Sequence, residues 1–178
     1  MVFEKTKFNS AISVWPKGLS DEMNISVAFK AECEKGELTL RLCAQNTYQL
    51  YINGALVMWG PARAGKGFFR VDEIDISNYL TRDKNELLVL VSSYRCANFY
   101  LINQAPFFCA ELIGKNGVTG ESGSDFWSAY RYTQKPYFSD QQLHYATATA
   151  FPPPNGKSHR RCEQAEHPQP PKPTETIR

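Results

Sequence analysis

Alternating apolar and polar residues run through most of the chain and predict β-strands. In residues 25–33 the apolar side chains Ile25, Val27 and Phe29 fall on every second position, and residues 38–44 repeat the pattern. A strand places successive side chains on opposite faces, so this period buries one face of a sheet and leaves the other in water. The two segments, joined by a short polar stretch, therefore predict an antiparallel meander.

The next strand prediction is a hairpin with a specific turn. Tyr48, Leu50 and Ile52 alternate with polar residues, and residues 55–59 provide the returning strand. Between them lies Asn53-Gly54, the pair that tolerates the two positive φ angles of a type I′ turn. A two-residue turn of this type predicts direct antiparallel pairing of the flanking strands.

Further short elements are expected along the rest of the body, without a long helical repeat. They are a β-like segment at 68–76, a single helical turn at 77–80, a polar turn at 82–85, a buried strand at 86–91, strands at 99–102 and 107–113, a hairpin turn at 114–117 and a closing strand at 126–132. Turn signals recur about every 8–12 residues, as in sandwiches and barrels. The expected fold is an all-β antiparallel β-sandwich of the jelly-roll type.

The last residues differ in composition from the body. Residues 151–178 contain 7 of the 11 prolines and almost no apolar side chains. Such a segment buries too little surface to offset the entropy of ordering, so we expect a disordered or polyproline-like tail. The expected organisation is a sandwich domain at 1–150 followed by a Pro-rich tail at 151–178.

Charge and hydropathy exclude some partner classes. Residues 1–150 carry 15 basic and 15 acidic residues, and the tail carries 5 and 3. A neutral body does not attract phosphate backbones, so nucleic acid is not an expected partner. No stretch reaches transmembrane length, and the N-terminus lacks the apolar core of a signal peptide. We expect a soluble protein that is cytoplasmic as given and has no membrane partner.

The five cysteines do not form a motif. They lack CxxC spacing, and Cys33, Cys43 and Cys109 lie in apolar strand-like runs, where a free thiol acts as a small hydrophobic side chain. Cys96 with His144 or His159 lacks a third orienting group. We therefore expect neither a disulfide framework nor a thiol nucleophile.

Four short motifs in this chain resemble a known enzyme family. The Asn-Gly turn at 53–54, GPAR at 60–63, FFRVDE at 68–73 and DIS-x-YL at 75–80 follow in order. This order resembles the N-terminal β-sandwich region of bacterial α-L-rhamnosidase-like glycoside hydrolases. The turn and DIS-x-YL are shared more loosely by galactose-binding-like modules, including those of β-galactosidase relatives. The resemblance covers residues 12–150 and is most specific at 46–112.

The resemblance implies a non-catalytic accessory domain. Enzymes of this family remove terminal α-L-rhamnose from glycans or glycosides with inversion, using an acid and a base in a helical (α/α)₆ barrel. No segment of this sequence has the pattern of that barrel, so no catalytic residue is carried over and the chain alone is expected to be inactive. The parent enzyme would be periplasmic if it carried a signal peptide. The Pro-rich tail departs from the family, and truncation, a frameshift and a vector-derived scar remain open as its origin.

Two apparent motifs are interpreted as structural. Residues 60–66 match GxxxxGK, but Gly67 replaces the Ser or Thr that would hold Mg²⁺, and a strand rather than a helix is expected next. Asp72 and Glu73 point to opposite faces of a strand, unlike the converging carboxylates of a glycosidase. We expect these acidic residues and Asp75 to pair with Arg70 or cap the turn at Ser77. No cofactor or metal site is predicted.

One set of residues could contact a sugar: Trp59, Arg63, Arg70, Tyr94 and Asn98. Sugar recognition needs an aromatic face for C–H groups and planar donors for hydroxyls, and loops of a sandwich commonly carry such groups. The alternative is that Trp59 is half-buried at a strand end and that the set faces the catalytic domain. An apolar patch of Trp59, Phe68 and Phe69 would then be uncovered here.

The expected partners are therefore a rhamnose-containing glycan or the catalytic domain of a parent enzyme. Three functions compete: an accessory domain of an α-L-rhamnosidase-like enzyme, a free-standing carbohydrate-binding module of weak affinity, and a self-sufficient small enzyme. The third requires a convergent polar site, which the sequence does not indicate.

Overall fold

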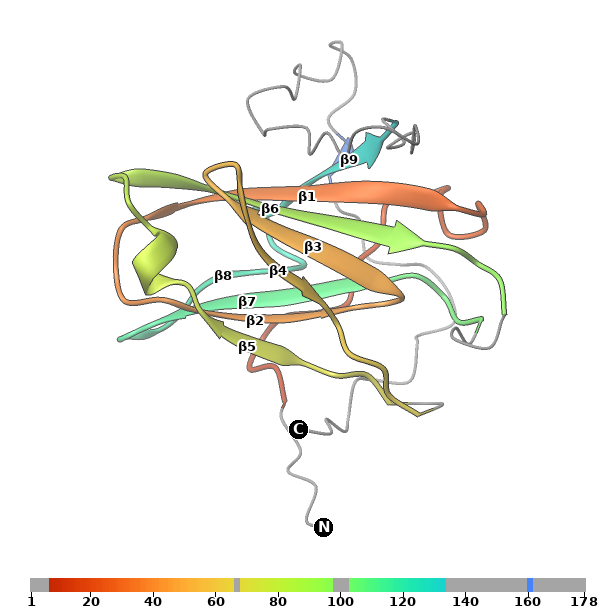
Figure 1. The fold of residues 1–178 in the computed structure, drawn as a ribbon, viewed down its shortest axis with the longest axis horizontal. Coiled ribbons are helices and arrows are strands. Elements are labelled where there is room, and N and C mark those ends of the chain that lie inside the picture. The colour runs from red at the N-terminus through yellow and green to blue at the C-terminus, as the bar shows by residue number, and fades with distance from the viewer. Residues whose placement is uncertain (1–6, 66–67, 98–102, 134–159, 162–178) are drawn as a thin grey trace, which may run out of the picture.

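Two antiparallel sheets packed face to face form a β-sandwich, as the sequence predicted (Figure 1). The computed structural model describes residues 7–65, 68–97, 103–133 and 160–161. The six-stranded sheet has the order β10 (Arg160–Arg161), β9 (Ser128–Tyr132), β1 (Ile25–Glu34), β6 (Lys84–Ser93), β3 (Thr47–Ile52) and β4 (Ala55–Gly60). The four-stranded sheet has the order β5 (Asp72–Asp75), β2 (Thr39–Ala44), β7 (Phe108–Gly114) and β8 (Gly117–Glu121).

Several local predictions are confirmed. Asn53 and Gly54 have φ angles of 51° and 86°, so the β3–β4 hairpin has the expected positive-φ turn. The helical turn appears as a 3₁₀ turn, η1 (Ser77–Tyr79). β7 and β8 are joined at the predicted hairpin of residues 114–117. These features depend on nearby residues, which is why the sequence shows them.

Other boundaries were wrong. The segment expected at 68–76 is a strand only from Asp72 to Asp75. The polar turn expected at 82–85 ends earlier, because β6 begins at Lys84 and pairs with Glu34 of β1. The short strand β8, which pairs with β7, was not predicted. In each case pairing with a distant strand, rather than the local pattern, sets the boundary.

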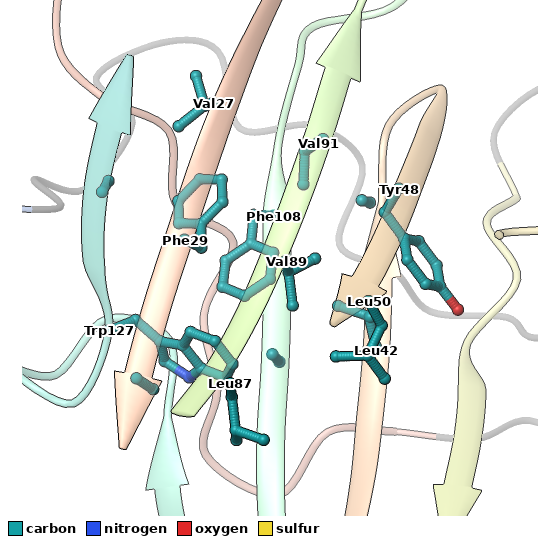
Figure 2. Packing of buried hydrophobic residues seen from close by; sticks show 14 of the residues in the cluster. Val27, Phe29, Leu42, Tyr48, Leu50, Leu87, Val89, Val91, Phe108 and Trp127 are labelled. Atoms are coloured by element: carbon teal, nitrogen blue, oxygen red, sulfur yellow. The ribbon is translucent and has the colours of Figure 1, made fainter. Parts of the chain in front are cut away.

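The main core lies between the sheets and is strongly aromatic (Figure 2). Phe29 of β1 stacks on Phe108 of β7, with ring centroids 4.0 Å apart and planes at 12°. The Trp127 ring meets Phe108 edge-on at 5.1 Å. Because Phe29 and Phe108 come from different sheets, this stack joins the two layers directly.

A second, smaller core covers the outer face of the four-stranded sheet. Its buried members are Cys43, Phe69, Val71, Phe107 and Cys109, and Phe8 and Ala11 pack against them. Burial raises the pKa of the Cys109 thiol to about 12 and that of Cys43 well above its ordinary value. All four described cysteines are free. Residues 68–71 do not form a strand, because Phe69 and Val71 of this segment pack over the outer face of the four-stranded sheet.

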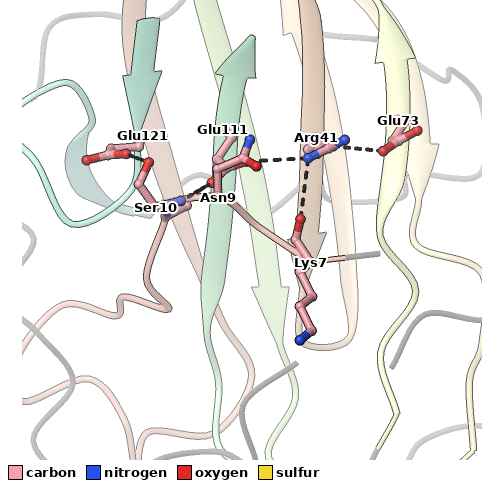
Figure 3. Close-up of polar contacts among 8 residues, drawn as sticks. Lys7, Asn9, Ser10, Arg41, Glu73, Glu111 and Glu121 are labelled. Carbon is pink, nitrogen blue, oxygen red and sulfur yellow. Dashed lines mark hydrogen bonds and ion pairs between the residues drawn. The ribbon is translucent and has the colours of Figure 1, made fainter. Parts of the chain in front are cut away.

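A strap of residues 7–14 crosses that outer face and is anchored by a buried carboxylate (Figure 3). Glu111 of β7 is completely buried and accepts the backbone N–H groups of Ser10 at 2.6 Å and Ala11 at 2.9 Å. The Ser10 hydroxyl also donates to Glu121. At the end of the strap, Val14 exchanges backbone hydrogen bonds with Phe108 and so forms a single β-bridge to β7.

The remaining expectations fall largely outside the described residues. Nearly all of the Pro-rich tail and the strand expected at 99–102 lie there. Within the tail, Arg160 and Arg161 form β10 and pair with Ser128 and Ala129 of β9. No helix in the described part of the chain is long and apolar enough to cross a membrane.

Candidate functional site

Trp59 is the most exposed aromatic side chain in the described structure. It lies at the end of β4, with 64% of its surface exposed, so the expectation that it is half-buried was wrong. A bulge opposite Leu50 and Tyr51 explains its orientation. Trp59 pairs with Gln49, and Leu56 pairs with Tyr51, so both apolar side chains project from the outer face of the sheet. Val57 and Met58 instead pack against the core.

The outer face beside Trp59 is formed by alternate residues of β3, β6 and β1. Gln49 lies between Trp59 and Leu90, and Thr47 lies beside Ser92, which lies beside Ser26. The Tyr51 hydroxyl donates to Gln49 Oε1 at 3.0 Å. The Ser26 and Ser92 hydroxyls are hydrogen-bonded at 3.0 Å. Alternation predicts that these residues face outward, but no motif singles them out, so sequence reasoning did not include them.

Arg70, a predicted site residue, is partly exposed and pairs with a buried carboxylate that also contacts the other sheet. Its Nε lies 3.1 Å from Asp72 Oδ1, and the Tyr48 hydroxyl donates to Asp72 Oδ2 at 2.6 Å. Burial, and then the hydrogen bond to Asp72, raise the pKa of the Tyr48 hydroxyl. A Cβ on Gly60 would lie 2.7 Å from the Tyr48 hydroxyl, so this position requires glycine. The contact ties β3 of one sheet to β5 of the other.

The other predicted residues come from segments that follow different strands. Arg63 is exposed in the loop after β4, and half-buried Tyr94 follows β6, two strands away from β4 in the sheet order. The Tyr94 carbonyl accepts the backbone N–H of Asn24. Asn98 lies outside the described residues. The predicted apolar patch also changes: Phe68 is 37% exposed, but Phe69 is buried against Phe107.

Asp72 and Asp75 make the contacts with Arg70 and Ser77 that were expected from the sequence, whereas Glu73 pairs with Arg41. Asp75 caps η1, because its Oδ1 accepts the backbone N–H and the hydroxyl of Ser77 at 3.0 and 2.6 Å, which lowers the pKa of Asp75. Glu73 pairs with Arg41 at 2.7 Å on the outer face. Within the described residues, no group of three or more His, Cys, Asp or Glu side chains is placed to hold a metal ion. Asp75 and Glu73 thus supply hydrogen bonds and an ion pair to the fold.

Comparison with known proteins finds this fold in parts of several solved structures. No family model and no curated protein matches the sequence. The GH78 family rhamnosidase of Bacillus sp. GL1 aligns with a TM-score of 0.62 and 23% identity, over 71% of this chain. The sandwich therefore has the same fold as the matched part of that enzyme.

Two further solved structures support the same conclusion about the fold. The α-L-rhamnosidase from Dictyoglumus thermophilum aligns with a TM-score of 0.56 and 15% identity over 97% of this chain. The apo form of the Pleurotus ostreatus lectin aligns with a TM-score of 0.54 and 14% identity over 94% of this chain. This chain spans only 14% and 21% of the two rhamnosidases and 45% of the lectin. The likeness is therefore to a portion of each of these proteins.

Proposed function

We propose that this sandwich is a non-catalytic accessory domain of an α-L-rhamnosidase-like glycoside hydrolase that acts on rhamnose-containing glycans or glycosides. The observation that carries the proposal is the partial match, since the fold accounts for 14% of the rhamnosidase from Bacillus sp. GL1. The ordered motifs at residues 53–80 support the same family. Its expected partner is the catalytic domain of the parent enzyme.

The carboxylates support a non-catalytic role. Glycoside hydrolysis requires an acid and a base on opposite sides of the scissile bond, with their carboxyl groups about 5–10 Å apart across a site open to the sugar. Asp72 and Glu111 are buried and accept hydrogen bonds from Tyr48 and from the strap, and Asp75 caps η1. These hydrogen bonds give the three carboxylates a part in stabilising the fold, which supports a non-catalytic role.

An activity assay tests the non-catalytic part of this proposal. The full chain, incubated with an aryl α-L-rhamnoside, is expected to release no aryl alcohol above background. Turnover that disappears in the Asp72→Asn or Asp75→Asn variant would contradict the proposal. The family assignment is tested separately by sequencing the DNA on both sides of the coding region. A reading frame that encodes a helical domain with paired acidic residues is expected.

A free-standing carbohydrate-binding module is the second candidate. The fold likeness to the Pleurotus ostreatus lectin and the exposed Trp59 favour it. One stacked ring and a few exposed hydrogen bonds leave little free energy after ordering costs, so the expected Kd is on the order of millimolar. Trp15 and Trp127 are 1% and 2% exposed and serve as internal references in a titration.

A further inference from the structure

The outer face of β1, β6, β3 and β4 carries two adjacent rows of uncharged residues that run across the strands. One row consists of Trp59, Gln49 and Leu90, and the other of Thr47, Ser92 and Ser26. The first offers an indole, an amide and an aliphatic surface, and the second offers three hydroxyls. The strands that carry both rows lie side by side in the six-stranded sheet (Figure 1).

Several polar groups in these rows are available for a ligand. Because the Tyr51 hydroxyl donates to Gln49 Oε1, the Gln49 amide is oriented, and its NH₂ group has no partner among the described residues. The Thr47 hydroxyl likewise has none within that part of the chain. In the Ser26–Ser92 pair one hydroxyl donates to the other, so the accepting hydroxyl keeps its own hydrogen for a further bond.

Ionised groups lie to one side of these rows, and two of them form an ion pair. Lys30 and Glu86 project from the same outer face and form an ion pair at 2.5 Å. Leu88, the cross-strand partner of Lys30, lies beside Leu90 on the same face and is buried although it faces outward. The surface that remains suits a ligand that is itself uncharged and rich in hydroxyl groups.

We infer that the outer face of β1, β6, β3 and β4 binds a neutral oligosaccharide laid across the strands. The Trp59 indole stacks on one sugar ring, while Gln49, Thr47 and the Ser26–Ser92 pair bond to hydroxyls along the oligosaccharide. This inference deepens the proposed carbohydrate-related function and rests on it. It moves the binding site from the loops to the sheet.

The composition of the face favours a sugar over a protein partner. The centre of a protein–protein interface is typically depleted in Ser, whereas small-ligand sites combine an apolar or aromatic surface with a few oriented polar groups. Here Ser26, Ser92, Thr47 and Gln49 lie on the face beside an aromatic ring that suits C–H stacking.

The spacing of the strands indicates the length of the ligand. Neighbouring strands lie about 4.8 Å apart, so β4 and β1, which are separated by β3 and β6, are about 14 Å apart. That span exceeds a single pyranose ring. A ligand that contacts both Trp59 and Ser26 must therefore be an oligosaccharide, and a monosaccharide can use only part of the face.

The experiment is an NMR titration of the ¹⁵N-labelled full chain. The probes are a ladder of α-linked rhamnose oligosaccharides from the monosaccharide to the hexasaccharide, and a matching ladder of β-1,4-linked glucose. In at least one ladder, the Trp59 indole N–H, the Gln49 side-chain amide and the Thr47 and Ser92 backbone amides should shift together. Affinity should rise with length until the ligand spans the face. The buried Trp15 and Trp127 indoles should not shift.

Variants separate a direct role from a change in folding. Trp59→Ala should weaken binding about tenfold without lowering the melting temperature, because the side chain is mostly exposed. Tyr79→Ala, which removes an exposed aromatic ring on η1, is the matched control and should leave the affinity unchanged. Gln49→Ala provides a second test of the face. Equal losses in the Trp59 and Tyr79 variants would overturn the inference.

The other possible outcomes of the titration also test the inference. Shifts confined to Arg63, Arg70 and Tyr94 would overturn the sheet-face site but keep sugar binding in the loops. No binding to either ladder would overturn the inference and the free-standing module, while the accessory-domain role would still be judged by the flanking reading frame. Shifts of Trp59 and Gln49 on dilution of the protein alone would show that a second copy occupies this face, and would also overturn it.

Discussion

Tyr48 shows how a single hydroxyl in the core joins two sheets. Its ring is buried in β3, and its hydroxyl reaches Asp72 at the edge of the other sheet, where Arg70 holds the second carboxylate oxygen. Gly60 leaves the space for this contact, since any Cβ there would overlap the hydroxyl. A buried polar group is stable only when it is hydrogen-bonded, so these residues act as a unit.

Replacing Tyr48 by Phe should lower the free energy of unfolding by about 1–3 kcal/mol at neutral pH, because Asp72 loses its hydroxyl donor while remaining buried. Urea denaturation of the two proteins measures the difference. Tyr51→Phe is the matched control: it removes a hydroxyl from the outer face, and we expect a smaller effect, within about 0.5 kcal/mol. Equal losses in the two variants would contradict the role of Tyr48.

The same pair of proteins predicts a pH dependence. Burial, followed by the Asp72 hydrogen bond, raises the folded pKa of Tyr48, whereas an unfolded tyrosine ionises near pH 10. The contribution of Tyr48 is therefore fully present below about pH 10 and is lost as the pH rises further, because the unfolded chain ionises first. Stability of Tyr48→Phe should fall less steeply there. Burial also raises the pKa of the Cys43 and Cys109 thiols. This contribution to the pH dependence is the same in both proteins, so it cancels when their stabilities are subtracted.

At the scale of elements, the strap of residues 7–14 covers the outer face of the four-stranded sheet. Its backbone N–H groups bond to Glu111, a carboxylate with no exposed surface, and Phe8 and Ala11 cover the small core around Cys43 and Cys109. Arg41 lies between Glu73 and Glu111, at 2.7 and 3.8 Å, and so balances part of the buried charge (Figure 3). The strap thus depends on one buried acceptor.

We expect Glu111→Ala to loosen the strap and to lower the free energy of unfolding by about 1–3 kcal/mol, because two backbone donors lose their acceptor. Amide exchange at Ser10 and Ala11 and thiol modification of Cys43 and Cys109 should both become faster. Glu73→Ala removes a partly exposed ion pair and should cost about 0–1 kcal/mol without exposing the thiols. If Glu111→Ala left thiol reactivity unchanged, the strap would not be held by this carboxylate.

At the scale of the whole molecule, the aromatic contacts between the layers should make both sheets unfold together. Phe29 and Phe108 come from different sheets, and Trp15 and Trp127 pack onto the same stack. The two buried indoles therefore report on the contact between layers, whereas far-UV circular dichroism reports on the strands. Coincident transitions by the two probes are expected of a cooperative domain of this size.

Phe108→Ala should lower the free energy of unfolding by about 3–5 kcal/mol, the usual cost of truncating a buried phenylalanine. Denaturant titration followed by tryptophan fluorescence and circular dichroism tests this, and the two curves should still coincide. Phe68→Ala, at a partly exposed position, is the control and should cost much less. Separate transitions in the wild-type protein would show that the sheets are not coupled through this stack.

The sequence by itself determined the features that depend on neighbouring residues. The period of two in β1, β2 and β3 selects strands and assigns their inner faces, and Asn53-Gly54 sets the hairpin turn through two positive φ angles. The cap of Asp75 on Ser77 also lies within one turn of chain. Steric limits on φ and short-range hydrogen bonds act without the rest of the fold, so these predictions hold.

Only the tertiary structure decided which polar and apolar groups are covered. Glu111 is buried because a strap about 100 residues earlier in the chain supplies its donors, and Phe69 is buried because Phe107 lies against it. The bulge opposite β3 turns Trp59 outward beside Gln49. Burial and register depend on segments far apart in sequence, which the local pattern of residues does not encode.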